Sequence, residues 1–203
     1  MRWCIVFVVV MLIGGCGTAD SDTSGLGGAA VIDRIDLPQP EVTSGGALTE
    51  ALAQRRSIRQ YQPQPLELTE VSQLLWAAQG VTSSNGRRTA PSAGALYPLE
   101  LYLVTPDGQY RYDPNRHQLE VLGEDDVRTQ LSRAALSQEA VETAPAVFVV
   151  AAVHSRTEQK YGERTERYVN LEAGHAAQNL LLQAVVLGLG AVPVGAFDDD
   201  EVQ

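Results

Sequence analysis

Cysteine and histidine are scarce in this 203-residue chain, and each scarcity excludes a class of protein or site. Two cysteines are too few for a disulfide-stabilised scaffold, and the three histidines are too scattered to match the spacing of a metal-ligand motif. A net charge of −10 argues against nucleic-acid binding, because that function needs a basic surface. The hydrophobic content of 44% is too high for a disordered chain.

The chain also lacks an apolar run long enough to cross a membrane. Its longest run, residues 4–13, is about half of the roughly 20 residues that a transmembrane helix needs. Arg2 precedes this run, and Leu12-Ile13-Gly14-Gly15-Cys16 resembles a bacterial lipobox, a signal whose cysteine is lipidated. We therefore predict a signal peptide over residues 1–15 and an exported lipoprotein, anchored at Cys16 on the periplasmic face or the cell surface. The alternative is an ordinary signal peptide with an incidental cysteine.

The rest of the chain divides into a linker and a domain. Residues 16–45 are rich in glycine, serine, threonine and aspartate, which predicts a flexible, lipid-anchored linker. Residues 46–203 have the length of one ordinary domain. Apolar spacing there predicts helices and strands without a regular βαβ alternation, so the fold class is α+β. The expected helices cover 47–52, 71–78, 126–136 and 173–186, and the expected strands cover 99–104, 109–112, 118–122, 147–153 and 191–195.

Two of these elements are expected to lie in the interior. The strand at 147–153 is almost continuously apolar, which predicts burial on both faces of a sheet. The second half of the helix at 173–186 is apolar all round, which predicts a central helix. The glycines after it, Gly188 and Gly190, end a helix before a strand. A dinucleotide-binding fingerprint needs the reverse order, so we reject that interpretation.

Fourteen of the fifteen basic residues are arginines, and five of these lie in two clusters. In the first cluster, Arg55, Ser57 and Arg59 occupy alternate positions, and in an extended segment they would converge on one anion. The alternative is a basic helix end that interacts with its own C-terminal dipole, and spacing alone favours neither. The second cluster, Arg87 and Arg88, has no assigned role.

Two further segments do not indicate a function when each is considered alone. Residues 91–100 contain small residues that would let a flat ligand approach the backbone, with Ser92 and Tyr97 as hydrogen-bonding groups. Residues 193–198 form a turn after a strand, which could direct backbone N–H groups at a heterocycle. An ordinary loop and an ordinary turn explain them equally well.

Taken together, the three segments resemble the nitroreductase-like flavoprotein family. The similarity rests on R-R-S-I-R-Q-Y and on N-L-E-A-G-H-A-A-Q-N-L-L-L-Q-A-V-V-L-G-L-G-A-V-P-V-G-A-F, in that order and spacing. The stretch P-S-A-G-A-L-Y-P-L-E is similar to the SagB-type branch, which includes azoline dehydrogenases of peptide-modifying gene clusters. The resemblance covers Leu48 to the end of the chain.

The resemblance implies an FMN-dependent oxidoreductase with a mainly antiparallel sheet, flanking helices and a long buried central helix. It implies a homodimer with FMN at the interface. Arg55, Ser57 and Arg59 would hold the phosphate and ribityl chain, and the turn at Pro193, Val194, Gly195 and Ala196 would face the N5 and O4 edge of the flavin. Ser92, Ala93 and Gly94 would lie beside the flavin ring across the dimer. Tyr97 is a candidate pocket acid or base, with packing as the alternative.

The implied reaction is a ping-pong hydride transfer through flavin N5, with NADH or NADPH as the reductant and a small molecule or peptide as the other substrate. An azoline-to-azole peptide dehydrogenase is the first alternative. A flavin-free binding lipoprotein is the second. Family members usually continue past the G-A-F-D turn through a helix and a final strand. Because this sequence ends at Gln203, we expect a C-terminally truncated domain that lacks that strand.

Overall fold

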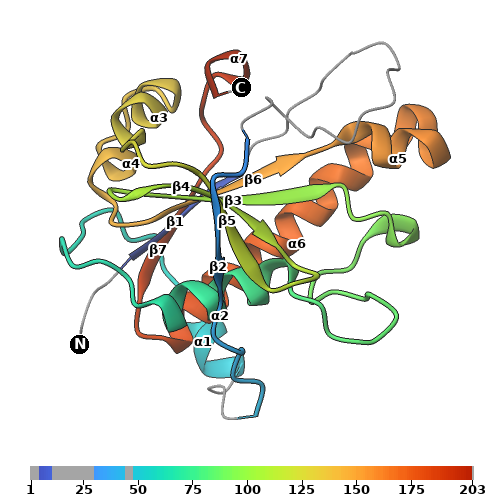
Figure 1. Ribbon diagram of the computed structural model, residues 1–203, viewed down its shortest axis with the longest axis horizontal. Helices are drawn as coiled ribbons and strands as arrows, with labels where there is room; N and C mark the ends of the chain where they lie inside the picture. The colour runs from blue at the N-terminus through green and yellow to red at the C-terminus, as the bar shows by residue number, and fades with distance from the viewer. Residues whose placement is uncertain (1–4, 11–29, 44–47, 203) are drawn as a thin grey trace.

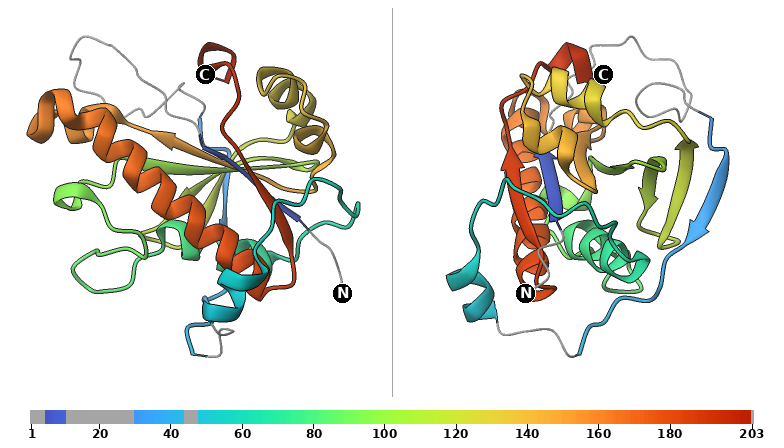
Figure 2. Two further views of the ribbon diagram at one scale, coloured as in Figure 1. Left: turned by 180° about the vertical axis from the view of Figure 1, so that it is seen from behind. Right: turned by 90° about the vertical axis from the view of Figure 1, so that its left-hand side faces the viewer.

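A computed structural model describes residues 5–10, 30–43 and 48–202, which build a seven-stranded sheet with helices against both faces (Figures 1 and 2). The strand order is β2-β5-β4-β3-β6-β1-β7. The first five strands in this order, β2-β5-β4-β3-β6, pair with one another in antiparallel fashion, whereas β1 is parallel to both β6 and β7. The strands are β1 Ile5–Val10, β2 Asp33–Asp36, β3 Leu99–Thr105, β4 Gly108–Asp113, β5 Gln118–Gly123, β6 Val147–Ala152 and β7 Gly190–Val194. The predicted α+β class and the mainly antiparallel sheet are confirmed.

The helices are α1 Leu48–Gln54, α2 Leu68–Gln79, α3 Arg128–Ala134, α4 Glu139–Thr143, α5 His154–Tyr161, α6 Thr165–Val186 and α7 Asp199–Val202, with 3₁₀ turns η1 at Ala93–Ala95 and η2 at Gly162–Arg164. The four helices predicted from the spacing are present as α1, α2, α3 and α6, whereas α4 and α5 were not predicted. Helix α2 starts at a capping box formed by Glu67 and Glu70. It ends at Gly80, where a Cβ atom would lie 2.1 Å from the Trp76 ring, so a side chain at this position would clash.

Strand β6 is buried along its whole length, as predicted. Phe148 and Val150 point into one core layer, which they share with residues of α2 and α6. Val147 and Val149 point into the other layer, which they share with residues of α3 and α4. Helices therefore cover both faces of this strand, and this double cover explains its unbroken apolar sequence.

Helix α6 runs diagonally across the sheet from α5 to α1 (Figure 2, left). One of its faces, with Val169, Ala173 and Leu180, is fully buried. On the other face Leu171 and Val186 are 54% and 36% exposed. The predicted long central helix is confirmed, and it packs one side on the sheet while the other side faces away from it.

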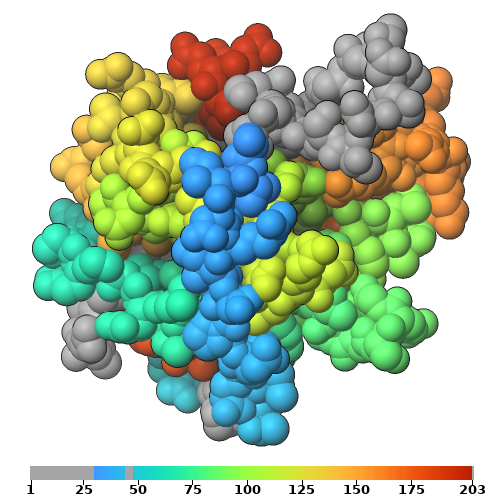
Figure 3. All heavy atoms as spheres, viewed as in Figure 1, coloured from blue at the N-terminus to red at the C-terminus, as the bar shows by residue number. Residues whose placement is uncertain are grey.

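Residues 30–43 belong to the folded domain, although their composition predicts a linker. Strand β2 pairs with β5, and Leu37 is buried with its backbone N–H donating to the His117 carbonyl oxygen at 3.1 Å. The Pro38 carbonyl oxygen accepts the Ser72 hydroxyl at 2.5 Å. Figure 3 shows this segment in blue across one face of the molecule, beside the β4–β5 hairpin. The linker prediction fails here because strand pairing supplies the hydrogen bonds that a polar composition does not reveal.

Part of the predicted signal peptide, Ile5–Val10, forms strand β1 between β6 and β7. Cys16 and the rest of the lipobox lie outside the described residues. Within the described ranges, no helix is both long enough and apolar enough to cross a membrane. At the other end, α7 begins where the resemblance places a helix.

Candidate functional site

The first arginine cluster lies beside strand β7. Ser57 forms an isolated parallel bridge with Ala191, and the backbone N–H of Ile58 donates to the Ala191 carbonyl oxygen at 3.0 Å. Three residues further on, Tyr61 packs on the core layer that contains Val194. The structure thus brings two of the predicted site segments together: the segment with Arg55, Ser57 and Arg59, and the strand that leads to the turn with Pro193, Val194, Gly195 and Ala196.

The arginines of this segment have different surroundings. The Arg56 guanidinium donates to the carbonyl oxygens of Ala53 and Arg55, at 3.0 and 2.7 Å, so Arg56 caps the C-terminal end of α1. Arg55 and Arg59 form no ion pair with any carboxylate in the part of the chain that the structure describes. The helix-end interpretation is therefore correct for Arg56, whereas the other two guanidinium groups are available to an anion.

A cavity of about 210 Å³ opens next to these arginines. Arg55 and Ile58 line one side, and Leu181 of α6 and Gly190 of β7 line the other. Tyr61 fixes the backbone nearby, because its hydroxyl donates to the Ile58 carbonyl oxygen at 2.9 Å. Burial raises the Tyr61 pKa and outweighs the opposing charge of Arg59, so this hydroxyl stays a neutral donor.

The turn after β7 is held from its far side. The Gln138 side-chain amide donates to the Ala196 carbonyl oxygen at 2.9 Å, and the Asp198 backbone N–H donates to the Ala134 carbonyl oxygen at 2.8 Å. Val194 is buried, whereas Pro193, Gly195 and Ala196 are exposed. The turn therefore presents open backbone on a support made by α3 and α4.

The third predicted segment, residues 92–97, forms a tight turn. The Ser92 hydroxyl accepts the Tyr97 backbone N–H at 2.9 Å. Gly94, Ala95 and Tyr97 have φ angles of +63°, +55° and +47°. Such angles are unfavourable for residues other than glycine, so surrounding contacts must hold this turn in place.

Lys160 and Tyr161, at the end of α5, pack against the turn. A Cβ atom on Gly94 would lie 2.8 Å from the Lys160 Nζ and 3.0 Å from the Tyr161 hydroxyl oxygen. Sequence reasoning did not select these residues. The signal that could have indicated them is that Lys160 is the only lysine in the chain.

Tyr97, the candidate acid or base, is fixed on two sides. The Arg88 guanidinium lies 4.5 Å from the centroid of the Tyr97 ring, and Arg156 donates to the Tyr97 carbonyl oxygen at 3.4 Å. These contacts support the packing interpretation of Tyr97. They also indicate a structural role for Arg88, for which the sequence predicted none.

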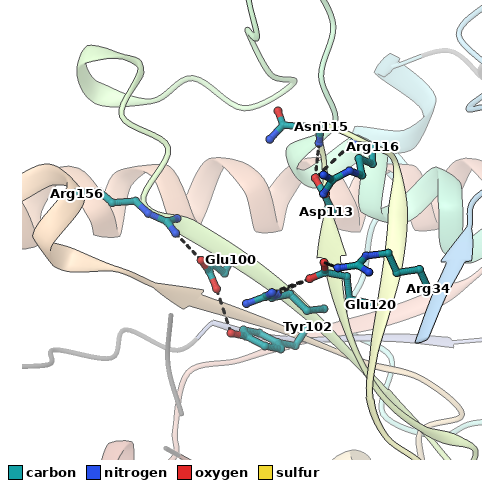
Figure 4. Close-up of polar contacts among 9 residues, drawn as sticks. Arg34, Glu100, Tyr102, Asp113, Asn115, Arg116, Glu120 and Arg156 are labelled. Carbon is teal, nitrogen blue, oxygen red and sulfur yellow. Dashed lines mark hydrogen bonds and ion pairs between the residues drawn. The ribbon is translucent and has the colours of Figure 1, made fainter. Parts of the chain in front are cut away.

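A larger cavity of about 540 Å³ lies beyond the turn, between α5 and the β3–β5 strands. Its wall carries a network of ion pairs (Figure 4). Arg156 pairs with Glu100 at 2.6 Å and Arg116 with Asp113 at 3.0 Å, while Glu120 pairs with both Arg111 and Arg34, at 2.7 and 3.2 Å. Each of these three carboxylates therefore has an arginine partner already.

The two halves of the candidate site lie at different positions along α6. The turn at 92–97 faces Glu172 and the end of α5, whereas the Arg55 segment faces Leu181 and Val185. At a rise of about 1.5 Å per residue, these positions on the helix are roughly 14 to 20 Å apart. Within one chain, Ser92, Ala93 and Gly94 therefore do not lie beside Arg55 and Arg59.

Known proteins are similar to this chain in sequence and in fold. A family model described as the nitroreductase family matches residues 52–203. A Methanocaldococcus jannaschii protein named as a nitroreductase is 44% identical over 177 residues, covering 84% of this chain and 89% of its own length. A solved Ralstonia eutropha JMP134 chain named as a nitroreductase is 36% identical, with a TM-score of 0.70 and coverage of 81% of this chain and 76% of its own. A Desulfovibrio desulfuricans chain named as a nitroreductase, solved with FMN, shares the fold at 24% identity, with a TM-score of 0.53 and coverage of 73% and 68%.

Proposed function

The chain belongs to the nitroreductase family, and from this premise we propose that it is an FMN-dependent oxidoreductase. The observation that carries the proposal is that the guanidinium groups of Arg55 and Arg59 have no carboxylate partner among the described residues, on a segment that bridges to β7 and whose Arg55 lines an open cavity. Guanidinium groups match phosphate oxygens in geometry and charge. The FMN-bound relative with the same fold supports this choice of ligand.

The residues present fit FMN. Arg55, Ser57 and Arg59 would hold the phosphate and the ribityl chain, since they supply two cations and a neutral donor on one segment. The exposed backbone at Gly195 and Ala196 would face the N5 and O4 edge of the ring. The chemistry that FMN supplies when bound is hydride exchange at N5, which suits a ping-pong cycle with NADH or NADPH as the reductant.

We propose that the active species is a homodimer. Two observations support it: the turn at 92–97 and the Arg55 segment are separated along α6, so a second copy could bring one to the other, and adjacent helices expose apolar side chains. Leu48 and Leu52 of α1 are 64% and 53% exposed, beside Val186 of α6. Light scattering should give twice the chain mass. Leu52→Glu should shift the protein toward monomer, and a monomeric parent would contradict the proposal.

The substrate class is a finer part of the proposal. The 91–100 segment supports a SagB-type enzyme, in which an azoline peptide is oxidised, whereas the family as a whole supports reduction of nitroaromatics or quinones. Purified protein with FMN should be tested on both substrate classes. Turnover of azoline peptides alone would select the dehydrogenase, and turnover of nitroaromatics or quinones alone would select the reductase.

We propose an exported lipoprotein on the strength of the lipobox. Cleavage before Cys16 would also remove β1 and leave no strand between β6 and β7, so export and the sheet described above compete for the same residues. Mass spectrometry of the protein from membrane and soluble fractions tests this. A lipidated N-terminal Cys16 supports export, whereas a chain that retains residues 1–15 contradicts it.

FMN binding is the central test. Purified protein should bind FMN in equilibrium dialysis, and Arg55→Ala should weaken binding by roughly 10- to 100-fold, since a hydrogen bond to a charged group contributes about 1.5–3 kcal/mol. The matched control is Arg116→Ala, which removes the same charge from the exposed β4–β5 turn. A protein that binds no FMN would instead support a flavin-free binding lipoprotein.

A further inference from the structure

Glu172 is a carboxyl group in an environment that does not suit a charge. It lies on the inner side of α6 with 2% of its surface exposed, and its Oε1 atom has no hydrogen-bond partner in the part of the chain that the structure describes. Burial raises the Glu172 pKa to about 7, although Ser92, Arg88 and Gln79 favour the ionised form. The ion pairs of the neighbouring cavity do not include it.

The groups around Glu172 are those that hold the turn at 92–97. Ser92, whose hydroxyl accepts the Tyr97 N–H, faces the carboxyl group. Arg88 lies over the Tyr97 ring and donates to the Gln79 Oε1 at 3.1 Å. Gln79, on α2, is 1% exposed, and its Nε2 atom also lacks a partner among the described residues. The turn and Arg88 thus separate Glu172 from solvent.

Other charged or titratable groups contact this cluster from the neighbouring elements. From α5, Arg156 donates to the Tyr97 carbonyl oxygen and Lys160 lies against Gly94. From β4, Tyr112 lies in the field of Arg88, and burial keeps its pKa raised. The Tyr112 hydroxyl is hydrogen-bonded to His117, whose pKa burial lowers, so this histidine titrates at more acidic pH than Glu172. Of Glu172, Tyr112 and His117, Glu172 is the group whose shifted pKa, about 7, lies at neutral pH.

We propose that Glu172 is a positioning residue for the turn at 92–97: its protonated carboxyl group is compatible with the closed turn, and its ionisation favours an open turn in which water reaches the carboxylate. The physical reason is linkage, because any opening that hydrates Glu172 restores an ordinary acidity and releases its proton. The positive φ angles at Ala95 and Tyr97 are unfavourable for residues with a side chain, so opening of this turn would relieve backbone strain. One consequence rests on the proposed function: FMN should bind more weakly as pH rises, because Ser92, Ala93 and Gly94 belong to this turn.

Amide hydrogen exchange in the flavin-free protein tests the inference directly. Protection factors, which correct for the intrinsic pH dependence of exchange, should fall by about tenfold at the Tyr97 and Ala95 amides between pH 6 and pH 8. Glu172→Gln, which stays neutral, should keep the protection of the acidic form at both pH values. The matched control, Glu166→Gln on the exposed side of α6, should behave like the parent protein.

A second variant keeps the test independent of Glu172→Gln. Arg88→Gln removes a cation that favours ionised Glu172, so the midpoint of the protection change should move to higher pH. Equal protection at pH 6 and pH 8 in the parent protein would overturn the inference, as would an unmoved midpoint in Arg88→Gln. Failure of the protein to bind FMN would contradict the proposed function and leave the exchange result valid.

Discussion

The two arginine clusters look alike in sequence and differ in the folded protein. In the first cluster, Arg55 lines an open cavity, and neither Arg55 nor Arg59 forms an ion pair with any described carboxylate. In the second, Arg87 is exposed, whereas Arg88 is drawn toward the interior, onto Tyr97, Gln79 and Glu172. Arg55 and Arg88 are both partly buried, so their partners distinguish them: Arg55 has no described carboxylate partner and is available to a ligand, whereas Arg88 contacts groups of the protein itself.

The largest expected effect is on the pH dependence of the free energy of unfolding. It comes from Glu172, which lies beside Arg88 of the second cluster. The Glu172 pKa is about 7 in the folded chain and about 4.3 when unfolded, so the folded state holds the extra proton between these values. The free energy of unfolding should therefore fall as pH rises from about 4 to 7, by up to about 3 kcal/mol. Urea unfolding of the parent and of Glu172→Gln measures this as a difference. Identical pH profiles in the two proteins would contradict it.

Removal of the buried cation should have the next largest effect. Arg88→Ala leaves Gln79 without its hydrogen bond, Tyr97 without its stacked partner and Glu172 without its nearest cation. We expect the free energy of unfolding to fall by about 2–3 kcal/mol. Arg87→Ala, at an exposed neighbour, should change it by less than about 0.5 kcal/mol. Equal effects would remove the contrast between an exposed and a buried arginine.

The turn that Arg88 supports offers a smaller test. Gly94→Ala should destabilise the protein by about 1–2 kcal/mol, because φ is positive and the new Cβ meets Lys160. Gly86→Ala is the matched control, since Gly86 has a φ of +77° and nothing within 4 Å of the Cβ position. The difference between the two variants isolates the contact with Lys160. If Gly86→Ala costs as much as Gly94→Ala, that contact contributes nothing.

The smallest effect is expected inside the first cluster. Arg56 is exposed, and its guanidinium donates to two backbone carbonyl oxygens at the end of α1, so Arg56→Ala should leave FMN affinity unchanged and lower stability by about 0.5 kcal/mol. Its comparison with Arg55→Ala in the same dialysis experiment tests whether the cluster is divided as the structure indicates. A loss of affinity in Arg56→Ala similar to that in Arg55→Ala would assign both arginines to the ligand.

The sequence predicted helices and strands best where their apolar pattern was strong. The apolar run at 147–153 is strand β6, and the apolar stripe at 173–186 is the second half of α6. Strand β2 was missed because Asp33–Asp36 is polar and exposed, and only its pairing with β5 makes it a strand. Helix α5 was missed as well, since its sequence carries no apolar stripe.

The candidate site was likewise predicted only in part from the sequence. Local spacing marked Arg55, Ser57 and Arg59 as candidates for an anion site but left the helix-end alternative open, and their phosphate-binding role rests on the family resemblance and stays a prediction. The partners of Arg88 come from α2, the turn at 92–97 and α6, which are up to about 90 residues apart in the chain. No local pattern contains that information.

The sequence by itself determined the family, most of the helices and strands and a set of candidate site residues, because each depends on residue type at short spacing. Tertiary structure alone decided which arginine is free and which is committed, that Lys160 and Tyr161 lie on Gly94, and that Glu172 is enclosed beneath a turn from another part of the chain. The physical reason is that burial and electrostatic partners are properties of packing. They fix the charge state of a side chain only after distant segments have come together.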